Sequence, residues 1–357
     1  MQKRLLITGN EAVGAGAIEA GCDCYFGYPI TPQNELTAYM ALHMLAEKRV
    51  FVQAESEVSA INMVYGASSA GCRVMTSSSS PGVSLKQEGI SYLAGSELPA
   101  VIINVQRGGP GLGNIEPSQA DYFQAVKGGG HGDYCVIVLA PSSVQEMYDF
   151  TMKAFDLADL YRMPVMVLSD GRLGQMMEPL KPKKRSKAAA AKLPPKDWSL
   201  TGAKDGRPKR VVKSFFPADD TLEKHNQKLA AKYKMIQRKQ TRAEDYFTED
   251  AELVLVAYGT VARLCREVVR RARKKKLPMG LLRPITLWPF PGTRIKRLAG
   301  RVKGFLVVEM SAGQMVEDVR LAVNGTVPVA FYGRMGGGVP EIDEIYRRAR
   351  KLLKEKL

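Results

Sequence analysis

The sequence predicts an α/β protein built on a parallel sheet that helices cover on both faces. Short, nearly continuous apolar runs alternate with longer stretches whose apolar residues recur at helical spacing. Continuous apolar runs are typical of strands buried on both faces, as in parallel sheets. A basic stretch that contains proline interrupts this pattern once, and the pattern then resumes, which indicates two α/β units.

The first unit is expected within residues 1–175. Its predicted strands are Asp23–Tyr28, Val50–Gln53, Arg73–Thr76, Ala100–Val105, Cys135–Leu139 and Pro164–Ser169. Its predicted helices are Gln33–Leu45, Val58–Ala70 and Val144–Leu160. In the last of these, Val144, Met147 and Phe155 recur at roughly helical spacing.

Residues 176–247 are predicted to be a basic linker with a helical excursion. Lys181–Lys213 is rich in lysine, alanine and proline, and residues 218–247 look helical and polar. A second, smaller α/β unit is expected over residues 248–357. Its predicted strands are Leu253–Tyr258, Met279–Leu282, Phe305–Glu309 and Val327–Tyr332, and its predicted helices are Val261–Lys276, Met315–Val323 and a C-terminal helix.

The charge balance is strongly basic. The chain of 357 residues has 52 Lys and Arg against 36 Asp and Glu, a net charge of +16. The excess is concentrated in 181–192, 204–213 and 270–276, and such runs are usually solvated faces or linkers. They can also attract acidic proteins or phosphorylated cosubstrates. Because no basic motif interleaved with aromatic residues is visible, nucleic-acid binding is not expected.

The sequence indicates a cytoplasmic protein without a metal site of its own. No apolar run is long enough for a membrane span, and the apolar part of residues 1–8 is too short for a signal peptide. The five cysteines are scattered, and only Cys22 and Cys24 lie close together. A CxC pair alone lacks the ligands for zinc or an iron–sulfur cluster.

Ligands of an open parallel sheet bind beyond the carboxyl ends of its strands, so residues that follow predicted strands are candidates. Gly27–Pro32 is the first such place. Thr31 is expected to cap a helix with Pro32 at its first position, and the free N–H groups there suit a carboxylate. Arg107, which ends another strand, is either a bidentate partner for a carboxylate or a surface residue.

Two carboxylates, Glu55 and Glu57, stand where a strand passes into a helix. Acidic residues are ordinary in a first helical turn. A carboxylate here could instead share a proton with the ring nitrogen of an aminopyrimidine, provided that burial raises its pKa. The serine-rich loop at Thr76–Gly82 could line a pocket, and His131 in a glycine-rich loop is ambiguous.

Taken together, these stretches resemble the alpha subunit of the 2-oxoacid:ferredoxin (acceptor) oxidoreductases. The resemblance is closest to the 2-oxoisovalerate (3-methyl-2-oxobutanoate, branched-chain) type. It covers nearly the whole chain. The motifs that carry it are Gly27–Pro32, Glu55–Asn62, Ser78–Gly82, Gln106–Gly113, Tyr122–Tyr134, Arg283–Pro291, Val308–Asp318 and Gly333–Pro340.

The resemblance implies a pyrimidine-binding domain followed by a transketolase C-terminal-like domain. A separate beta chain would supply the diphosphate-binding half of the thiamine diphosphate site, with Mg²⁺ and a [4Fe–4S] cluster. On this chain Glu57 would contact the aminopyrimidine as the catalytic group, with Glu55 as the alternative in a shifted register. Thr31 and Arg107 would bind the substrate carboxylate. The remaining cofactor contacts implied are Tyr28, Pro29, Ser79 and Ser80.

The expected activity is oxidative decarboxylation of a 2-oxoacid to an acyl-coenzyme A, with ferredoxin as electron acceptor. The chain would be active only with its beta partner, and a gamma or a ferredoxin-like subunit is a further partner left open. A 2-oxoglutarate-specific enzyme is the alternative within this class. A scaffold subunit without catalytic activity is the alternative from another class, and a basic nucleic-acid-binding protein is the third.

Overall fold

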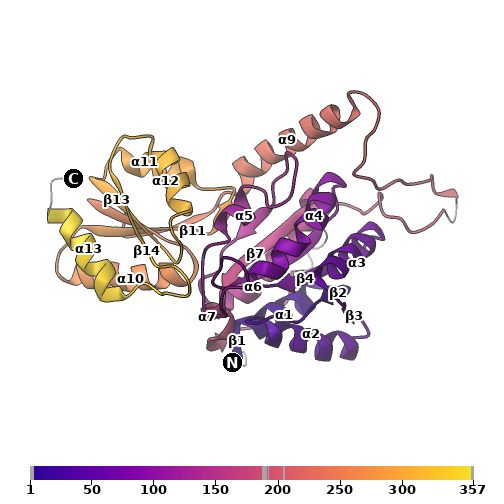
Figure 1. Cartoon of the computed structure of the whole chain (residues 1–357), viewed down its shortest axis with the longest axis horizontal. Helices are drawn as coiled ribbons and strands as arrows, with labels where there is room; N and C mark the ends of the chain where they lie inside the picture. Colours follow the sequence, from indigo (N-terminus) through magenta and orange to yellow (C-terminus); the bar gives the residue numbers. More distant parts are fainter. Residues whose placement is uncertain (1–3, 187–190, 192, 204–205, 355–357) are drawn as a thin grey trace.

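The α/β fold is confirmed in a computed structural model that describes residues 4–186, 191, 193–203 and 206–354. Parts of the predicted basic linker, namely 187–190, 192 and 204–205, lie outside the described residues. Two sheets form the framework, one of seven strands in the order β12-β6-β7-β5-β4-β2-β3 and one of five in the order β14-β13-β10-β11-β9. They lie in the two units seen side by side in Figure 1, with the second drawn in orange and yellow.

Six strands of the first sheet run parallel, as their apolar runs predicted. They are β2 (Cys24–Gly27), β3 (Val50–Gln53), β4 (Val74–Ser78), β5 (Ala100–Gln106), β6 (Ile137–Leu139) and β7 (Pro164–Asp170). The helices of this part are α1 (Gly9–Ala20), α2 (Asn34–Ala46), α3 (Glu57–Ser69), α4 (Ser80–Gly95), α5 (Tyr122–Val126), α6 (Val144–Tyr161) and α7 (Gly171–Gln175).

The second sheet is parallel apart from one edge strand. Its strands are β9 (Ala243–Tyr246), β10 (Leu253–Val256), β11 (Met279–Pro284), β13 (Gly304–Glu309) and β14 (Val329–Gly333). The helices that follow these strands are α10 (Gly259–Lys274), α11 (Gly292–Ala299), α12 (Met315–Val323) and α13 (Ile342–Lys354).

Two strand pairings were not predicted from the sequence pattern. β12 (Thr286–Trp288) comes from the second half of the chain but pairs antiparallel with β6 of the first sheet. β9 lies in the segment expected to be helical, and it pairs antiparallel with β11. Both pairings depend on partners far away in the chain, and no local pattern encodes them. Where the chain divides into independently folding units therefore stays a prediction.

The segment expected to be a linker contains further regular structure. β8 (Met177–Leu180) pairs with β1 (Leu5–Thr8), and helix α9 covers Thr221–Gln240. The helical excursion is thus confirmed for α9 but wrong for the residues that form β9. Neither β1 nor α1 was predicted, although a capping box supports α1. Its N-cap Thr8 accepts a hydrogen bond from the Glu11 N–H, and Glu11 accepts one from the Thr8 N–H.

Gln119 ties the two units together at their junction. Its side-chain amide donates to the Tyr258 carbonyl at 3.0 Å and accepts from the Met310 N–H at 3.0 Å. Nearby, the Tyr122 hydroxyl donates to Asp318 at 2.6 Å. These buried contacts fix the second unit against the loops that end the strands of the first sheet. Among the described residues, no helix combines the length and the apolar character needed to cross a membrane.

Candidate active site

Three of the predicted site segments meet at the carboxyl edge of the first sheet, because β2, β4 and β5 are neighbours in it. Arg107 directly follows β5 and reaches the loop after β2. Its Nη1 donates to the Thr31 carbonyl at 2.9 Å, and its Nη2 donates to the Leu112 carbonyl at 3.1 Å. The side chain is buried, with 7% of Arg107 exposed. The two residues predicted to hold a carboxylate therefore lie in contact.

The predicted cap at Thr31 is wrong. Helix α2 begins at Asn34, and its N-cap position is Gln33. Side chains that are distant in the sequence bind the backbone carbonyls just before this helix. Arg107 donates to the Thr31 carbonyl, and Asn10 Nδ2 donates to the Pro32 carbonyl at 2.8 Å. These long-range bonds keep Thr31 in the loop, where its hydroxyl accepts a hydrogen bond from the Asn34 side chain at 3.2 Å.

Glu57 is the first residue of α3 and its carboxylate is turned inward. Only 6% of the residue is exposed, and among the described residues no hydrogen bond or ion pair to its carboxylate is recorded. Opposite it lies Gly82 in α4. A Cβ atom on Gly82 would lie 2.4 Å from Glu57 Oε1 and 2.1 Å from Ser78 Oγ. The bare glycine thus keeps space open for both oxygen atoms.

Two serine hydroxyls at the end of β4 also lack partners among the described residues. The hydroxyls of Ser78 and Ser79 are buried and have no hydrogen-bond partner among the described residues. Buried polar groups are usually hydrogen-bonded, and unpaired ones in a native protein call for an explanation such as a ligand or water. Glu57 and Ser78, which lie together at Gly82, are therefore available to a ligand here, and Ser79 is the next residue along the chain with an unpaired hydroxyl.

Glu55, the alternative carboxylate, points to solvent. It accepts hydrogen bonds from Ser59 Oγ at 2.6 Å and Ser56 Oγ at 3.0 Å, and these bonds lower the pKa of Glu55. Ser80 is likewise engaged, because its hydroxyl donates to Asp121 Oδ2 at 2.6 Å. These two side chains already have partners, whereas no partner of the Glu57 carboxylate or the Ser79 hydroxyl is recorded among the described residues.

The remaining candidates lie at the surface. Tyr28 is 38% exposed in the loop after β2, and Pro29 beside it is exposed as well. His131 is exposed in the loop after α5, and none of its interactions points to the Glu57 cluster. A role for Tyr28 and Pro29 therefore requires that a ligand or another chain covers them.

Two residues of the site were missed by sequence reasoning. Asp121 accepts from Ser80 and from Asn104 Nδ2 at 2.9 Å, and burial raises its pKa. Lys86 in α4 is fully buried, and its Nζ donates to Thr76 Oγ1 at 2.7 Å and to the Ser77 carbonyl at 3.0 Å. Asp121 had no local signal. Lys86 had one, because it occupies a position of the apolar stripe formed with Val83 and Ile90.

Burial makes Lys86 sensitive to pH. It lowers the pKa of Lys86 from 10.5 to about 7, and the charge of Glu57 opposes this shift. Between those values the unfolded chain binds the proton more tightly than the folded chain does. The buried charge therefore lowers the free energy of unfolding by its full amount below about pH 7, and this destabilisation disappears as the pH rises toward 10.5.

We expect Lys86→Met to change stability in a pH-dependent way. Loss of the bonds to Thr76 and Ser77 destabilises the variant at every pH, whereas removal of the buried charge stabilises it only at low pH. The variant's stability relative to wild type should thus fall, on the order of 4 kcal/mol, as pH rises from about 7 to about 10. Thermal unfolding at several pH values measures this difference. A difference that does not change with pH would contradict the shift.

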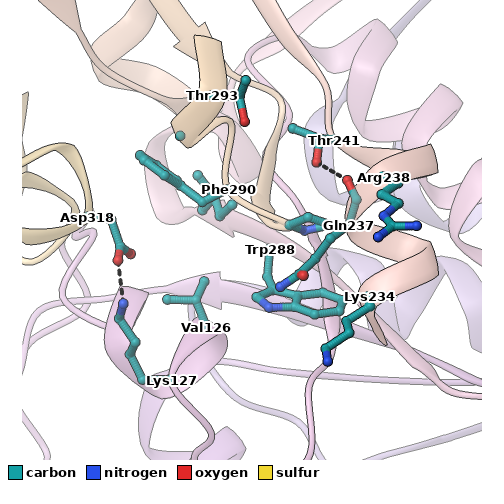
Figure 2. A pocket seen from close by; sticks show the side chains of 13 residues that line it. Val126, Lys127, Lys234, Gln237, Arg238, Thr241, Trp288, Phe290, Thr293 and Asp318 are labelled. Atoms are coloured by element: carbon teal, nitrogen blue, oxygen red, sulfur yellow. Dashed lines mark hydrogen bonds and ion pairs between the residues drawn. The ribbon is translucent and has the colours of Figure 1, made fainter. Parts of the chain in front are cut away.

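A separate cavity of about 710 Å³ lies away from the Glu57 cluster, where α9, β12 and the start of α11 meet (Figure 2). Lys234 and Arg238 of α9 and the ring of Trp288 line it. The ion pair between Lys127 and Asp318 lies at its edge in Figure 2. None of the predicted site residues lines this cavity, so it is not part of the candidate active site.

Two family descriptions match the chain in succession. Residues 15–245 match "Pyruvate flavodoxin/ferredoxin oxidoreductase, thiamine diP-bdg". Residues 251–345 match "Pyruvate:ferredoxin oxidoreductase core domain II". The boundary between the two matches falls between β9 and β10.

Similar proteins of known name cover almost the whole chain. It is 53% identical over 350 residues to the ketoisovalerate oxidoreductase subunit VorB of Methanothermobacter marburgensis, with 98% of each chain covered. It is 38% identical to the 2-oxoglutarate synthase subunit KorA of Methanothermobacter thermautotrophicus, covering 99% of this chain and 100% of that one.

A solved structure has the same fold. It is the 2-oxoglutarate:ferredoxin oxidoreductase from Magnetococcus marinus with 2-oxoglutarate, coenzyme A and succinyl-CoA bound. The TM-score is 0.86 at 26% identity, and the match covers 99% of this chain. The chain spans 66% of that longer chain, so the larger protein contains parts that have no counterpart here.

Proposed function

The chain belongs to the pyruvate flavodoxin/ferredoxin oxidoreductase family, and from this premise we propose that it is the alpha subunit of a 2-oxoisovalerate:ferredoxin oxidoreductase. The reaction is oxidative decarboxylation of the 2-oxoacid to an acyl-coenzyme A, with ferredoxin reduced. The observation that carries the proposal is the buried Glu57, whose carboxylate has no recorded partner among the described residues and lies beside Ser78 in the room that the missing side chain of Gly82 leaves.

The polar groups at and next to Glu57 fit the pyrimidine half of thiamine diphosphate. Glu57 offers a carboxylate to a ring nitrogen, and the unpaired hydroxyls of Ser78 and Ser79 offer further hydrogen bonds to the ring. When bound, the cofactor supplies the carbon nucleophile and the electron sink of the reaction. Glu57 holds a proton at the ring nitrogen, which is the activating contact that this chain contributes.

Arg107 and Thr31 are proposed to bind the carboxylate of the 2-oxoacid. The Arg107 guanidinium has five N–H donors, and two of them hold the Thr31 and Leu112 carbonyls. These two bonds orient the planar group, and the donors that remain can serve a carboxylate. The Thr31 hydroxyl adds a donor of its own in the same loop.

Half of the site must come from another chain. Tyr28 and Pro29 are exposed beside Thr31, and the exposed apolar side chains of Leu112 and Ile115 follow Arg107. A beta subunit that covers this edge would exclude water and supply the diphosphate site with Mg²⁺ and a [4Fe–4S] cluster. A gamma or ferredoxin-like subunit completes the electron path to ferredoxin in this proposal, and the whole assembly is cytoplasmic.

The identity of the substrate rests on similarity. The relatives at 53% identity are named for ketoisovalerate, and two relatives at 37% and 38% are named for 2-oxoglutarate. A 2-oxoglutarate enzyme remains the second candidate, because a solved neighbour of the same fold carries that substrate. A second substrate carboxylate would require an additional cation in the pocket.

The test is an assay of the assembled protein. We would co-express the chain with the proteins encoded next to it and measure anaerobic viologen reduction that depends on thiamine diphosphate and coenzyme A. The substrates compared are 2-oxoisovalerate, 2-oxoglutarate, pyruvate and an aryl 2-oxoacid. We expect 2-oxoisovalerate to have the highest kcat/KM. A higher kcat/KM for 2-oxoglutarate would move the assignment to the second candidate.

Absence of activity would have a different meaning. If a well-assembled complex loaded with its cluster turned over none of the four substrates, the chain would be a scaffold that has kept the fold without the chemistry. Thiamine diphosphate binding, measured separately by calorimetry, would then show whether the cofactor site has also been lost.

A further inference from the structure

Lys86 is a buried lysine next to the proposed catalytic centre, and the proposed chemistry leaves it unused. Its lowered pKa of about 7 means that it carries its charge below about pH 7. It lies in α4, none of it is exposed, and both of its recorded acceptors belong to β4. These acceptors, Thr76 Oγ1 and the Ser77 carbonyl, are neutral. A buried ammonium without an ion-pair partner is costly, so its presence requires a reason beyond joining a helix to a strand.

The alternation of side chains along β4 places Lys86 and Glu57 on one side of the strand. Thr76 and Ser78 point to the same face of the sheet, as residues two apart in a strand do. Thr76 accepts from Lys86, and Ser78 lies beside Glu57 across Gly82. The Lys86 ammonium and the Glu57 carboxylate therefore lie next to neighbouring polar residues, Thr76 and Ser78, on one face of β4. No direct ion pair between them is recorded.

Glu57 on α3 is the charged group recorded as acting on Lys86 among the described residues. From β2, the Tyr25 hydroxyl reaches the same strand through Ser77 Oγ at 2.6 Å, and burial raises the pKa of Tyr25, so it stays neutral. The remaining contacts of Lys86 in β4 do not titrate in this range. The electrostatic influence of Lys86 is thus directed chiefly at Glu57.

We propose that Lys86 is a positioning residue whose buried positive charge weakens the hold of Glu57 and the cofactor ring on the proton that they share. The inference rests on the proposed function, because it takes the aminopyrimidine as the partner of Glu57. A positive charge behind a carboxylate lowers the affinity of the carboxylate and its partner for a shared proton. Replacement of Lys86 by a neutral residue raises that affinity.

The test is the pH at which the bound aminopyrimidine loses its ring proton. Difference circular dichroism between the cofactor-loaded and cofactor-free complex reports the protonated and neutral rings. In Lys86→Met and in Lys86→Gln we expect the midpoint to rise by about one pH unit, a tenfold gain in proton affinity. Gln can still donate to Thr76, so a shift in both variants isolates the charge from the hydrogen bond.

Lys232→Met is the matched control. Lys232 is a largely buried lysine that pairs with Glu97 far from Glu57, and its loss should lower stability without moving the midpoint. A wild-type midpoint in Lys86→Gln, or failure of both neutral variants to bind thiamine diphosphate although assembled, would overturn the proposal in favour of a structural role. A wild-type complex that binds no thiamine diphosphate would contradict the proposed function, and with it this inference.

Discussion

We expect Glu57→Gln to lower turnover severely while the protein still folds and assembles. The amide has the same shape but cannot take up or return a proton, so general acid–base assistance to the cofactor ring is lost. Such assistance contributes about 10²–10⁴-fold to enzymatic rates, and we expect kcat to fall within this range. Since no hydrogen bond or ion pair of the Glu57 carboxylate is recorded within the chain, thermal stability should change little. Viologen reduction and the elution volume of the complex measure the two properties.

Glu55→Gln is the matched control for this variant. Glu55 lies two residues earlier, is exposed, and has its own hydrogen bonds to Ser56 and Ser59. We expect it to retain wild-type turnover. The opposite pattern, with activity lost in Glu55→Gln and kept in Glu57→Gln, would show that the shifted register is correct. Near-normal turnover in both variants would show that neither Glu55 nor Glu57 takes part in the reaction.

The local sequence pattern identified Glu55 and Glu57 together as candidates, whereas the choice of Glu57 came from the family resemblance and its role stays a prediction. A strand that passes into a helix at the carboxyl edge of a sheet can be recognised from a few residues, and Val50–Gln53 and the helix after it were predicted within one residue of their observed bounds. The parallel sheet followed from the same kind of pattern. Core strands that are apolar on both faces can be identified without knowledge of their neighbours.

What the sequence did not predict depends on contacts between distant residues. The helix cap expected at Thr31 is not formed. Asn10 and Arg107, which lie far from this loop in the chain, instead donate hydrogen bonds to the carbonyls of Pro32 and Thr31. The formation of β9 and β12 likewise depends on pairing with remote strands. A local pattern predicts whether a segment forms a helix or a strand. Where that element ends and which strands it pairs with depend on contacts with distant parts of the fold.

Lys86 shows a different kind of failure. Its position within an apolar helical stripe was visible in the sequence, beside Val83 and Ile90. A lysine there could equally extend its stem over apolar surface and reach solvent with its ammonium group. Only the structure distinguishes the two cases, because the acceptors that hold Lys86 inside lie on a neighbouring strand.

Gly82→Ala inactivates the protein without unfolding it. The added methyl would lie 2.1 Å from Ser78 Oγ and 2.4 Å from Glu57 Oε1, and both of these atoms are ends of side chains that can move. The fold can therefore relax at small cost, but only if Glu57 leaves its present position. Since displacement of a catalytic group by about 1 Å can cost about 10²-fold in rate, we expect a loss of that order. We also expect thiamine diphosphate to bind at least about tenfold more weakly, as measured by calorimetry on the assembled complex.

Two other glycines separate this effect from ordinary steric or helical effects. Gly89, also in α4, would place a methyl 2.5 Å from Ile61 in the core, so Gly89→Ala should lower the unfolding temperature but preserve the affinity for the cofactor. Gly66 in α3 has no atom within 4 Å of such a methyl, and Gly66→Ala should be neutral or slightly stabilising. A Gly82→Ala variant that lost as much stability as activity would contradict this prediction. The absence of a side chain at Gly82 would then serve packing, as at Gly89, rather than cofactor binding.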